Sequence, residues 1–329
     1  MAVPLSSRGP TVEDVARRAG VSRATAARAL AGSDRVRPES REAVFRAADE
    51  VGYVVHASAR ALAAGRGTRV LIASVTPHGV TSLDPCAYLD RVVSTTAQLV
   101  TPYGLSVSLR PMPLDDERVL DQVARDRDLV GVVLVNAHRR LLEQVSRRMP
   151  GRAVSIGAGS AGVPLVDVDN RRSTTALAEH LVAAGRRRIA FVSGPTRVSC
   201  TSRAREGYAE VMTAAGLPVR IVPAAFSTAG GHAACDFVLR RWPDIDAVIA
   251  SCDDAAMGVM GCLARHGRRV PEDVAVTGFD DLPLASYAGL TSVTHPVEAV
   301  ASAAVGRLLA GSGSEEEWFA AAPVLRRTA

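Results

Sequence analysis

One stretch of the sequence has the spacing of a nucleotide-binding loop. Residues 157–162 read GAGSAG directly after a short apolar run, which matches the G-x-G-x-x-G fingerprint of dinucleotide-binding proteins. A chain that used this motif would be an oxidoreductase, with the pyrophosphate held at the N-terminus of the helix that follows. Residues 163–169 read VPLVDVD instead, an extended pattern with Pro164 inside the required first helical turn. We therefore predict a flexible loop here and neither a nicotinamide nor any other cofactor.

Other catalytic and metal-binding signatures are missing from the sequence. It contains no G-x-S-x-G nucleophile motif, no H-E-x-x-H zinc motif and no Walker phosphate loop. The five cysteines are odd in number, widely spaced and never form a C-x-x-C pair, which argues against a disulfide framework and a structural zinc site. We expect buried free thiols, no metal and no enzymatic activity.

The basic residues are concentrated near the N-terminus. The chain carries 39 basic and 34 acidic residues, for a net charge of +5, and every basic residue is arginine. Residues 1–66 hold eleven arginines against seven acidic residues, so +4 of the +5 lies in the first fifth of the chain. Arginine presents a planar donor fork that suits phosphates and guanine edges. A basic segment joined to a nearly neutral remainder predicts a nucleic-acid-binding module attached to another domain.

Helical signals in the basic segment predict a helix-turn-helix. Thr11 has the properties of an N-cap for a first short helix, which Gly20 ends. Ser22 is placed to cap a second helix, which Gly32 ends. A third helix begins with Pro38 at its first position and closes a three-helix core. The side chains that this third helix is expected to bury are Val44, Ala47, Ala48 and Val51.

These residues resemble the N-terminal domain of the lactose-repressor (LacI/GalR) family of bacterial transcription regulators. The match comprises TVEDVARRAGVS at residues 11–22, VGY at 51–53 and ARAL at 59–62. The resemblance implies that Arg23, Ala24 and Arg28 read bases in the major groove, while the hydroxyls of the second helix hold phosphates. It also implies a hinge helix at residues 58–64, with Leu62 inserted into the minor groove at the operator centre. The implied DNA-contacting residues are Thr11, Ser22, Arg23, Ala24, Thr25, Arg28, Tyr53, Ser58, Arg60 and Leu62.

Some positions depart from the pattern of this family. Ala26 and Ala27 stand where Val and Ser are usual, Ala31 replaces an Asn, and Val55 with His56 replaces Pro-Asn. The lost Ser and Asn side chains would contact phosphates or bases. We therefore expect weaker DNA binding or an unusual operator sequence.

After a glycine-rich joint at residues 64–67, short Val, Ile and Leu runs alternate with helical stretches. Such alternation predicts parallel sheets with right-handed crossovers, and strands that are apolar on both faces predict helices on both sides. The expected fold is a small all-α helix-turn-helix head plus an α/β body of two doubly wound parallel-sheet subdomains. The predicted strands lie near residues 70–75, 105–109, 130–135, 153–156, 188–193, 219–222, 247–251 and 274–278.

The body also resembles the rest of the LacI/GalR family, which is similar to periplasmic sugar-binding proteins. VDN at residues 168–170 and VPEDVAVTGFDD at 270–281 are among the matching landmarks. The resemblance implies two subdomains joined by three crossovers. The expected organisation is a disordered N-terminus at 1–10, a helix-turn-helix domain at 11–57, a hinge helix and linker at 58–67, and an effector-binding and dimerisation domain at 68–329. Its N-subdomain covers about 68–166 and 296–312, and its C-subdomain about 167–295 and 313–329.

The resemblance further implies an effector cleft outside the carboxyl ends of the strands. Asp280 follows a predicted strand, and the family often uses this Asp to accept hydrogen bonds from sugar hydroxyls; a helix cap or turn is the alternative role. Arg203 and Arg205 flank the position where an arginine is usual. The implied effector-contacting residues are His78, Arg203, Arg205, Cys252 and Asp280.

Four sites in the expected cleft depart from the family. Ala204 stands in place of the arginine, Cys252 in place of an Asn and Gly157 in place of a ligand-binding Asp, and the loop at residues 76–85 matches only loosely. These changes predict an unusual ligand or a weakened effector control.

The implied partners are a palindromic double-stranded DNA operator, a small-molecule effector and a second copy of the chain in a homodimer. No apolar run approaches the length of a membrane span and the N-terminus has no apolar signal core, so we expect no membrane partner and a cytoplasmic location. A ligand-independent or activating DNA-binding regulator remains an alternative. An NAD-type oxidoreductase, opposed by Pro164, and a solute-binding protein, opposed by the basic segment, are weaker alternatives.

Overall fold

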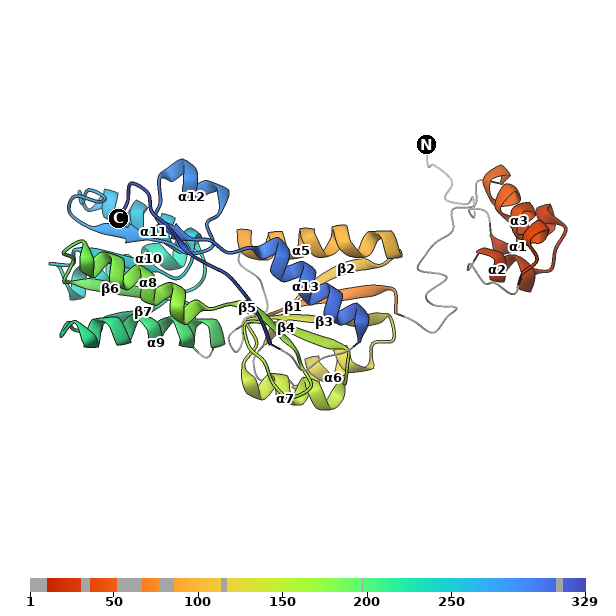
Figure 1. The fold of residues 1–329 in the computed structure, drawn as a ribbon, viewed down its shortest axis with the longest axis horizontal. Helices are drawn as coiled ribbons and strands as arrows, with labels where there is room; N and C mark the ends of the chain where they lie inside the picture. The colour runs from red at the N-terminus through yellow and green to blue at the C-terminus, as the bar shows by residue number, and fades with distance from the viewer. Residues whose placement is uncertain are drawn as a thin grey trace, which may run out of the picture. The chain divides into compact units, whose positions relative to one another are not determined.

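The computed structural model describes residues 11–30, 36–51, 67–76, 86–113, 117–196, 198–311 and 316–329. The chain divides into two compact units (Figure 1), a small helical head and a larger α/β body that begins at Arg69. Both confirm the fold class predicted from the sequence. The predicted disordered segment at 1–10 and all of the predicted hinge and linker except Gly67 lie outside the described residues.

Three short helices pack around a small apolar core to form the head. They are α1 (Val12–Ala19), α2 (Arg23–Leu30) and α3 (Pro38–Glu50). Many of the core side chains are alanine, which lets the helices approach closely. Val51, which was expected in this core, is only partly buried against it. The buried core residues are Val15, Ala16, Ala26, Ala29, Leu30, Val36, Val44, Ala47 and Ala48.

The turn between α1 and α2 is fixed by caps that the sequence predicts. The Asp14 N–H donates to Thr11 Oγ1 at 3.4 Å, and the Thr11 N–H donates to the Asp14 carboxylate at 2.9 Å, which makes a capping box. Gly20 ends α1 at φ 65°, a left-handed conformation that glycine adopts without steric cost. The Thr25 N–H donates to Ser22 Oγ at 3.1 Å at the start of α2.

The first half of the body is a six-stranded sheet in the order β11-β5-β4-β3-β1-β2, and every pairing in it is parallel. Helices α5 and α13 cover one face, and α6 and α7 cover the other (Figure 1). The strands are β1 (Arg69–Thr76), β2 (Ser106–Pro113), β3 (Leu129–Val135), β4 (Ala153–Ile156), β5 (Leu165–Val168) and β11 (Glu316–Phe319). The helices are α5 (Ala87–Val100), α6 (Glu117–Arg125), α7 (Arg139–Arg148) and α13 (Val297–Ala310); the 3-10 helix η1 (Thr101–Tyr103) follows α5.

The second half is a four-stranded parallel sheet in the order β7-β6-β8-β9. Alternate residues of β6 face opposite layers: Ile189 and Phe191 pack toward α8 and α9, while Ala190 and Val192 pack toward α10 and α11. Because both faces are covered, the strand is apolar from Ile189 to Val192. The strands are β6 (Ile189–Ser193), β7 (Ile221–Pro223), β8 (Ala247–Ala250) and β9 (Ala275–Thr277). The helices are α8 (Asn170–Ala183), α9 (Ser199–Ala214), α10 (Thr228–Arg241) and α11 (Asp253–Arg265).

The chain passes between the two halves three times. It leaves the six-stranded sheet after β5, returns through β10 (Ser292–Val293) into α13, and leaves again after β11. The last segment, β12 (Pro323–Val324), then pairs antiparallel with β10. Since β5 and β11 both belong to the six-stranded sheet, that half continues past the boundaries expected near residues 166 and 312. The short helix α12 (Pro283–Ala288) lies between β9 and β10.

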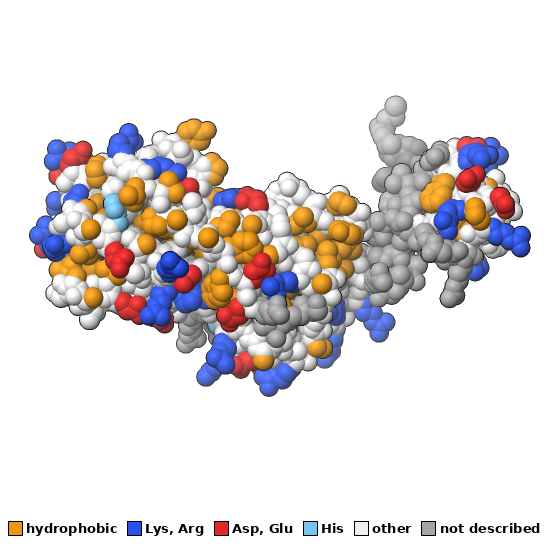
Figure 2. Space-filling view, viewed as in Figure 1, with side chains coloured by type: hydrophobic (Ala, Val, Ile, Leu, Met, Phe, Trp, Pro, Cys, Tyr) orange, Lys and Arg blue, Asp and Glu red, His pale blue; other side chains and the backbone are white. Residues whose placement is uncertain are grey.

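The segment with the dinucleotide-like motif forms a loop, as predicted. Residues 157–164 connect β4 to β5 without a helix, and a bridge between Ser160 and Val163 closes the turn. The short strands β10, β11 and β12 were not predicted, and β5 was expected only as part of the extended run at residues 163–169. Within the described ranges, no helix is long and apolar enough to cross a membrane. Acidic and basic side chains are interspersed on the visible face of the body (Figure 2), as a nearly neutral unit requires.

Candidate functional site

The outer face of α2 carries exposed basic side chains. Arg23, Ala24 and Arg28 are exposed, whereas Ala26 on the opposite side is buried in the head core. The guanidinium of Arg23 lies 3.5 Å from the Glu13 carboxylate in an exposed pair, which water and salt weaken. The Nε of Arg28 donates to the Ala24 carbonyl at 3.1 Å, which leaves the other guanidinium N–H groups as donors. This face has the shape and chemistry of a recognition helix.

The hydroxyls of Ser22 and Thr25, which are expected to hold phosphates, lie at the N-terminus of α2, and Thr11, another expected DNA contact, lies at that of α1. Ser22 Oγ is 2.8 Å from Thr25 Oγ1, and Thr11 Oγ1 donates to Asp14 Oδ2 at 2.7 Å. A helix N-terminus attracts anions through its free N–H groups and its dipole. Phosphate binding at these positions stays a prediction. The other expected contacts of the head and hinge, Tyr53, Ser58, Arg60 and Leu62, lie outside the described residues.

A cleft in the body collects side chains that follow the carboxyl ends of strands in both sheets. It encloses about 530 Å³ of space that is open to solvent, which suits a small metabolite. Asn136 follows β3 and Ser251 follows β8, and in each sheet this strand lies at the point where the strand order reverses. The lining residues are Cys86, Tyr88, Asn136, Ile156, Gly157, Asp167, Asn170, Cys200, Phe226, Ser251, Cys252, Phe279, Asp280 and His295.

A buried carboxylate–imidazole pair lies in this cleft. His295 Nδ1 is 2.9 Å from Asp280 Oδ1, and both residues are 8% exposed. His295 Nε2 is buried and has no hydrogen-bond partner among the described residues. Asp280 has φ 96°, a conformation that costs a non-glycine residue on the order of 1–3 kcal/mol. The backbone therefore holds the Asp280 carboxylate in a place that a relaxed turn would not give it.

A second carboxylate is paired with an arginine at the cleft. Asp167, at 2% exposure, lies with Oδ2 2.5 Å from Arg203 Nη2. Burial raises the pKa of Asp167, and the Arg203 guanidinium opposes that shift. Arg203 Nη1 also donates to the Gly157 carbonyl at 2.6 Å, and the guanidinium lies 5.2 Å from the ring centroid of Trp318. Arg203 thus contacts three segments: β5, β11 and the loop that follows β4.

Three cysteines line the same cleft as neutral thiols. Burial raises the pKa of Cys86 to about 11 and that of Cys200 to about 12, and it raises the pKa of Cys252 well above its ordinary range. A thiol that keeps its proton is a poor nucleophile and behaves as a small apolar group with a weak donor. The three thiols therefore present small neutral groups to the cleft.

The predicted effector residues fall into three groups. Cys252 and Asp280 line the cleft, and Arg203 contacts two lining residues, Asp167 and Gly157. Arg205 is not among the described residues that line it, and His78 lies outside the described residues. Sequence reasoning missed Asn136, Asn170 and His295 among others. Asn136 directly follows a predicted strand, so the rule that located Asp280 would also have located it. Asn170 and His295 each lie two positions after a strand, β5 and β10, that was not among those predicted.

Two family models match the chain. Residues 11–55 match the model described as bacterial regulatory proteins of the lacI family. Residues 178–321 match the model described as a periplasmic binding protein-like domain. The two matches fall on the head and on the body, respectively.

Relatives and solved structures cover nearly the whole chain. The HTH-type transcriptional regulator CelR of Thermobifida fusca is 33% identical over 303 residues, 88% of either chain. The regulator GntR of Pseudomonas aeruginosa is 33% identical over 315 residues, 92% of this chain and 89% of that one. A lac repressor dimer bound to operator and the anti-inducer ONPF superposes with a TM-score of 0.81 at 21% identity, covering 98% and 99% of the two chains. A CelR–cellobiose complex gives 0.65 at 30% identity, covering 97% and 100%. The chain belongs to the LacI family and is a DNA-binding transcriptional regulator.

Proposed function

We propose that this regulator is a homodimeric repressor of a palindromic operator, and that a neutral, hydroxyl-bearing metabolite of the sugar type controls it from the cleft. Each head presents one recognition face, on α2, and one such helix reads only one half-site. A two-fold dimer places two of these faces on an inverted repeat, so the symmetry of the protein matches that of the operator.

The observation that carries the ligand proposal is the pair of Asp280 and His295. His295 uses Nδ1 in its hydrogen bond with the Asp280 carboxylate, so its buried Nε2, which has no partner among the described residues, remains available to a polar atom of a ligand. A ligand hydroxyl can form this hydrogen bond in either direction, because a hydroxyl both donates and accepts. The aromatic rings of Tyr88 and Phe279 offer flat apolar surfaces beside these polar atoms, a mixture that fits a sugar ring.

The charges of the cleft favour a neutral ligand over an anionic one. The described lining residues include the carboxylates of Asp167 and Asp280 but no arginine or lysine. The guanidinium of Arg203, which contacts the lining residues Asp167 and Gly157, is already paired with Asp167. A phosphate or carboxylate ligand would therefore meet two carboxylates and, among the described lining residues, no unpaired guanidinium or ammonium group.

The relatives support a sugar-type ligand. CelR has been solved in complex with cellobiose, and a ribose operon repressor of Halalkalibacterium halodurans is 30% identical over 291 residues. The altered residues Cys252 and Gly157 both line the cleft of this chain. They favour a sugar with a different arrangement of hydroxyls from the usual ligands of the family.

The proposed switch couples the cleft to the predicted hinge at residues 58–64. A ligand that bridges the two sheets favours one arrangement of the subdomains, and a coupling of about 1–3 kcal/mol changes operator affinity about 5- to 150-fold. The apolar wedge Leu62 is expected to supply specific minor-groove binding. Leu62→Ala should then lose the operator while keeping nonspecific affinity; an equal loss of both would contradict the wedge.

The experiment that tests the proposal selects bound fragments from the source genome and footprints them. We expect protection of an inverted repeat by two chains, measured from the mass of the complex. A panel of neutral sugars, with sugar phosphates as matched anions, should contain a neutral member that changes operator affinity. Transcription from the selected promoter should fall when the regulator binds. Equal, salt-sensitive binding to every duplex would refute the operator proposal, and a response to the anions alone would refute the ligand proposal.

A further inference from the structure

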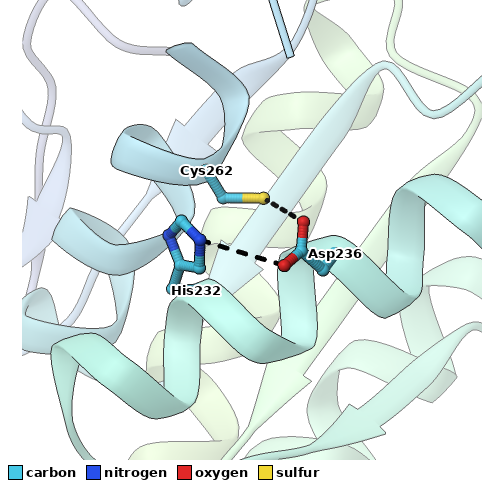
Figure 3. Close-up of side chains that lie close together, drawn as sticks. All are labelled: His232, Asp236 and Cys262. Atoms are coloured by element: carbon cyan, nitrogen blue, oxygen red, sulfur yellow. Dashed lines mark hydrogen bonds and ion pairs between the residues drawn. The ribbon is translucent and has the colours of Figure 1, made fainter. Parts of the chain in front are cut away.

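Two helices of the body carry matching pairs of metal-ligating residues. On α10, His232 and Asp236 are four positions apart. Cys262 of α11 and His266, the residue that follows the end of α11, have the same spacing. Residues four apart lie on one face of a helix. Figure 3 shows that His232, Asp236 and Cys262 point toward one another across the two helices.

Glycines let the two helices approach closely enough for these side chains to meet. A Cβ atom added at Gly231 would lie 2.0 Å from the carbonyl oxygen of Ala255, and one added at Gly258 would lie 2.0 Å from that of Thr228. Both clashes are with the backbone of the opposite helix. Only residues without a side chain fit at this crossing, so the spacing of α10 and α11 is fixed beside the cluster.

The ligand atoms are already near coordination distances. One atom each of His232, Asp236 and Cys262 lie within 4.8 Å of one another. The Cys262 thiol lies 3.4 Å from Asp236 Oδ1, and His232 Nε2 lies 3.8 Å from Asp236 Oδ2. Tetrahedral coordination at the usual zinc bond lengths places ligand atoms about 3.4–3.8 Å apart. Small rotations of the side chains therefore suffice to close them around one ion.

We propose that His232, Asp236 and Cys262, with His266 as a fourth ligand, form a binding site for a divalent transition-metal ion of the zinc class. One sulfur, two imidazole nitrogens and a carboxylate oxygen make the mixed donor set that such ions prefer over calcium and magnesium. A thiolate and a carboxylate balance the two positive charges of the ion, so the occupied site is neutral.

His266 is oriented for this role by its other nitrogen. Its Nδ1 lies 3.1 Å from the Cys262 carbonyl oxygen, which can only accept, so Nδ1 carries the proton in that hydrogen bond. In the neutral ring the lone pair is then on Nε2, which lies 3.6 Å from Asp236 Oδ1. A backbone carbonyl that fixes the tautomer in this way is a common second partner of metal-bound histidines.

The thiol of Cys262 must release its proton when the ion binds. Burial raises the pKa of Cys262, and so does the hydrogen bond that it donates to Asp236. Without an ion the thiol is thus the donor that satisfies the carboxylate. The ion replaces this proton: the S–H bond breaks, a sulfur–metal bond forms and the proton passes to solvent.

The metal site is separate from the ligand cleft. Cys252, which lines the cleft, caps the start of α11, and Cys262 follows ten positions later, about 15 Å along the helix. Two of the ligands, His232 and Asp236, are about one-third exposed, so an ion has access from solvent. The ion would cross-link α10 and α11 and stabilise the fold of the C-subdomain without contacting the sugar-type ligand.

Cobalt(II) is the probe that tests the site, because it replaces zinc and reports a bound thiolate by a charge-transfer absorption in the near ultraviolet. The full chain, stripped with a chelator, should show this band with one equivalent of cobalt, and zinc should abolish it. Cys262→Ser should lose the band, whereas the matched variant Cys86→Ser, which changes a cleft thiol, should keep it. Zinc should also raise the melting temperature of the wild type but not that of Cys262→Ser.

A second variant covers the case in which the buried substitution prevents folding. His232→Gln changes a partly exposed side chain and should weaken zinc binding about ten-fold or more, since loss of even a second-shell partner costs 10- to 100-fold. His180→Gln, on α8, is its matched control and should bind as the wild type does. The proposal is overturned if cobalt gives no thiolate band, if the band depends on Cys86 or Cys252 instead, or if His232→Gln binds zinc with wild-type affinity.

Discussion

His295 Nδ1 lies 2.9 Å from Asp280 Oδ1 at the cleft, and the two side chains come from segments that follow β9 and β10. The pair joins two functions in one hydrogen bond. The carboxylate fixes which imidazole nitrogen carries the proton, and the opposite nitrogen faces the ligand space. A change at Asp280 should therefore be felt at His295 even where Asp280 itself does not touch the ligand.

Asp280→Ala should reduce affinity for the controlling sugar about 5- to 150-fold, since an unsatisfied buried polar group costs about 1–3 kcal/mol. Titration calorimetry with the sugar that the wild type binds measures the effect. Operator affinity without sugar should stay within two-fold, roughly, because the head is unchanged. Asp244→Ala is the control, since that carboxylate is 63% exposed. Unchanged sugar affinity in Asp280→Ala would remove this pair from the ligand site.

The fold was largely predictable because its signals are local. The caps at Thr11 and Ser22 and the glycine at position 20 each act within four residues, and central body strands such as β3 and β8 are apolar on both faces. The structure shows eight of its strands near the predicted positions. The partner of β5 was not predictable in this way, since β11 lies about 150 residues away and has only four residues.

The cleft was predictable only in part, because its residues are brought together from distant segments. Asp280 follows a predicted strand and was located by the rule for doubly wound sheets, whereas Cys252 was named from the family resemblance; both line the cleft. The pairing of Asp167 with Arg203 joins residues 36 positions apart, and no sequence period reports it. Arg203 was expected at the ligand, whereas the structure places its guanidinium against a buried carboxylate.

Arg203→Ala should destabilise the body by about 3–5 kcal/mol, because it leaves Asp167 buried without a compensating charge. Urea denaturation measures the loss. Without the guanidinium the pKa of Asp167 should rise further, so the folded state takes up a proton and the loss shrinks as the pH falls. Adding Asp167→Asn should recover much of the stability. If the single and double variants are equally unstable, the charge is not the cause.

Asp253 should make the body less stable as the pH rises from about 4 to about 7. Burial raises the pKa of this carboxyl to about 7, whereas an unfolded Asp titrates near 4. Between these values the folded state binds more protons than the unfolded state, so the free energy of unfolding falls as the pH increases. The contribution of this single group is on the order of 4 kcal/mol over the window.

Asp253→Asn tests this contribution, since it keeps the shape of the side chain. The Asn oxygen can accept the Leu282 N–H, which now donates to Asp253 Oδ2 at 2.7 Å, and its amide can donate to Ser292 Oγ. Denaturation curves at several pH values give the free energy of unfolding as a function of pH. In the variant, this free energy should no longer fall between about pH 4 and pH 7. Asp273→Asn removes a partly exposed carboxyl whose pKa is lowered by Arg269, and it should leave the slope due to Asp253 in place. A slope that survives in Asp253→Asn belongs to another group.

Arg28→Ala should relax base choice on the operator. A bidentate arginine–base contact contributes about 1–3 kcal/mol, so affinity should fall about 5- to 150-fold on the preferred sequence. Binding to random duplex should fall much less. Electrophoretic shifts at fixed salt, repeated on single-base variants of the operator, measure both effects. Arg127→Ala, an exposed arginine of the body, is the control. A uniform loss on every sequence would assign Arg28 to the phosphates instead.

Gly231→Ala should disrupt the crossing of α10 and α11. The new Cβ would meet the Ala255 carbonyl oxygen at 2.0 Å, and backbone atoms move only if the helices separate. Overpacking of this kind costs about 1–3 kcal/mol or more. Gly261→Ala is a matched control on α11, because nothing lies within 4 Å of its added Cβ, and it should stabilise the helix by about 0.5–1 kcal/mol. Separation of the helices should also weaken the cobalt absorption band in Gly231→Ala, whereas Gly261→Ala should keep the band. Equal bands in the two variants would show that the close crossing does not position the metal ligands.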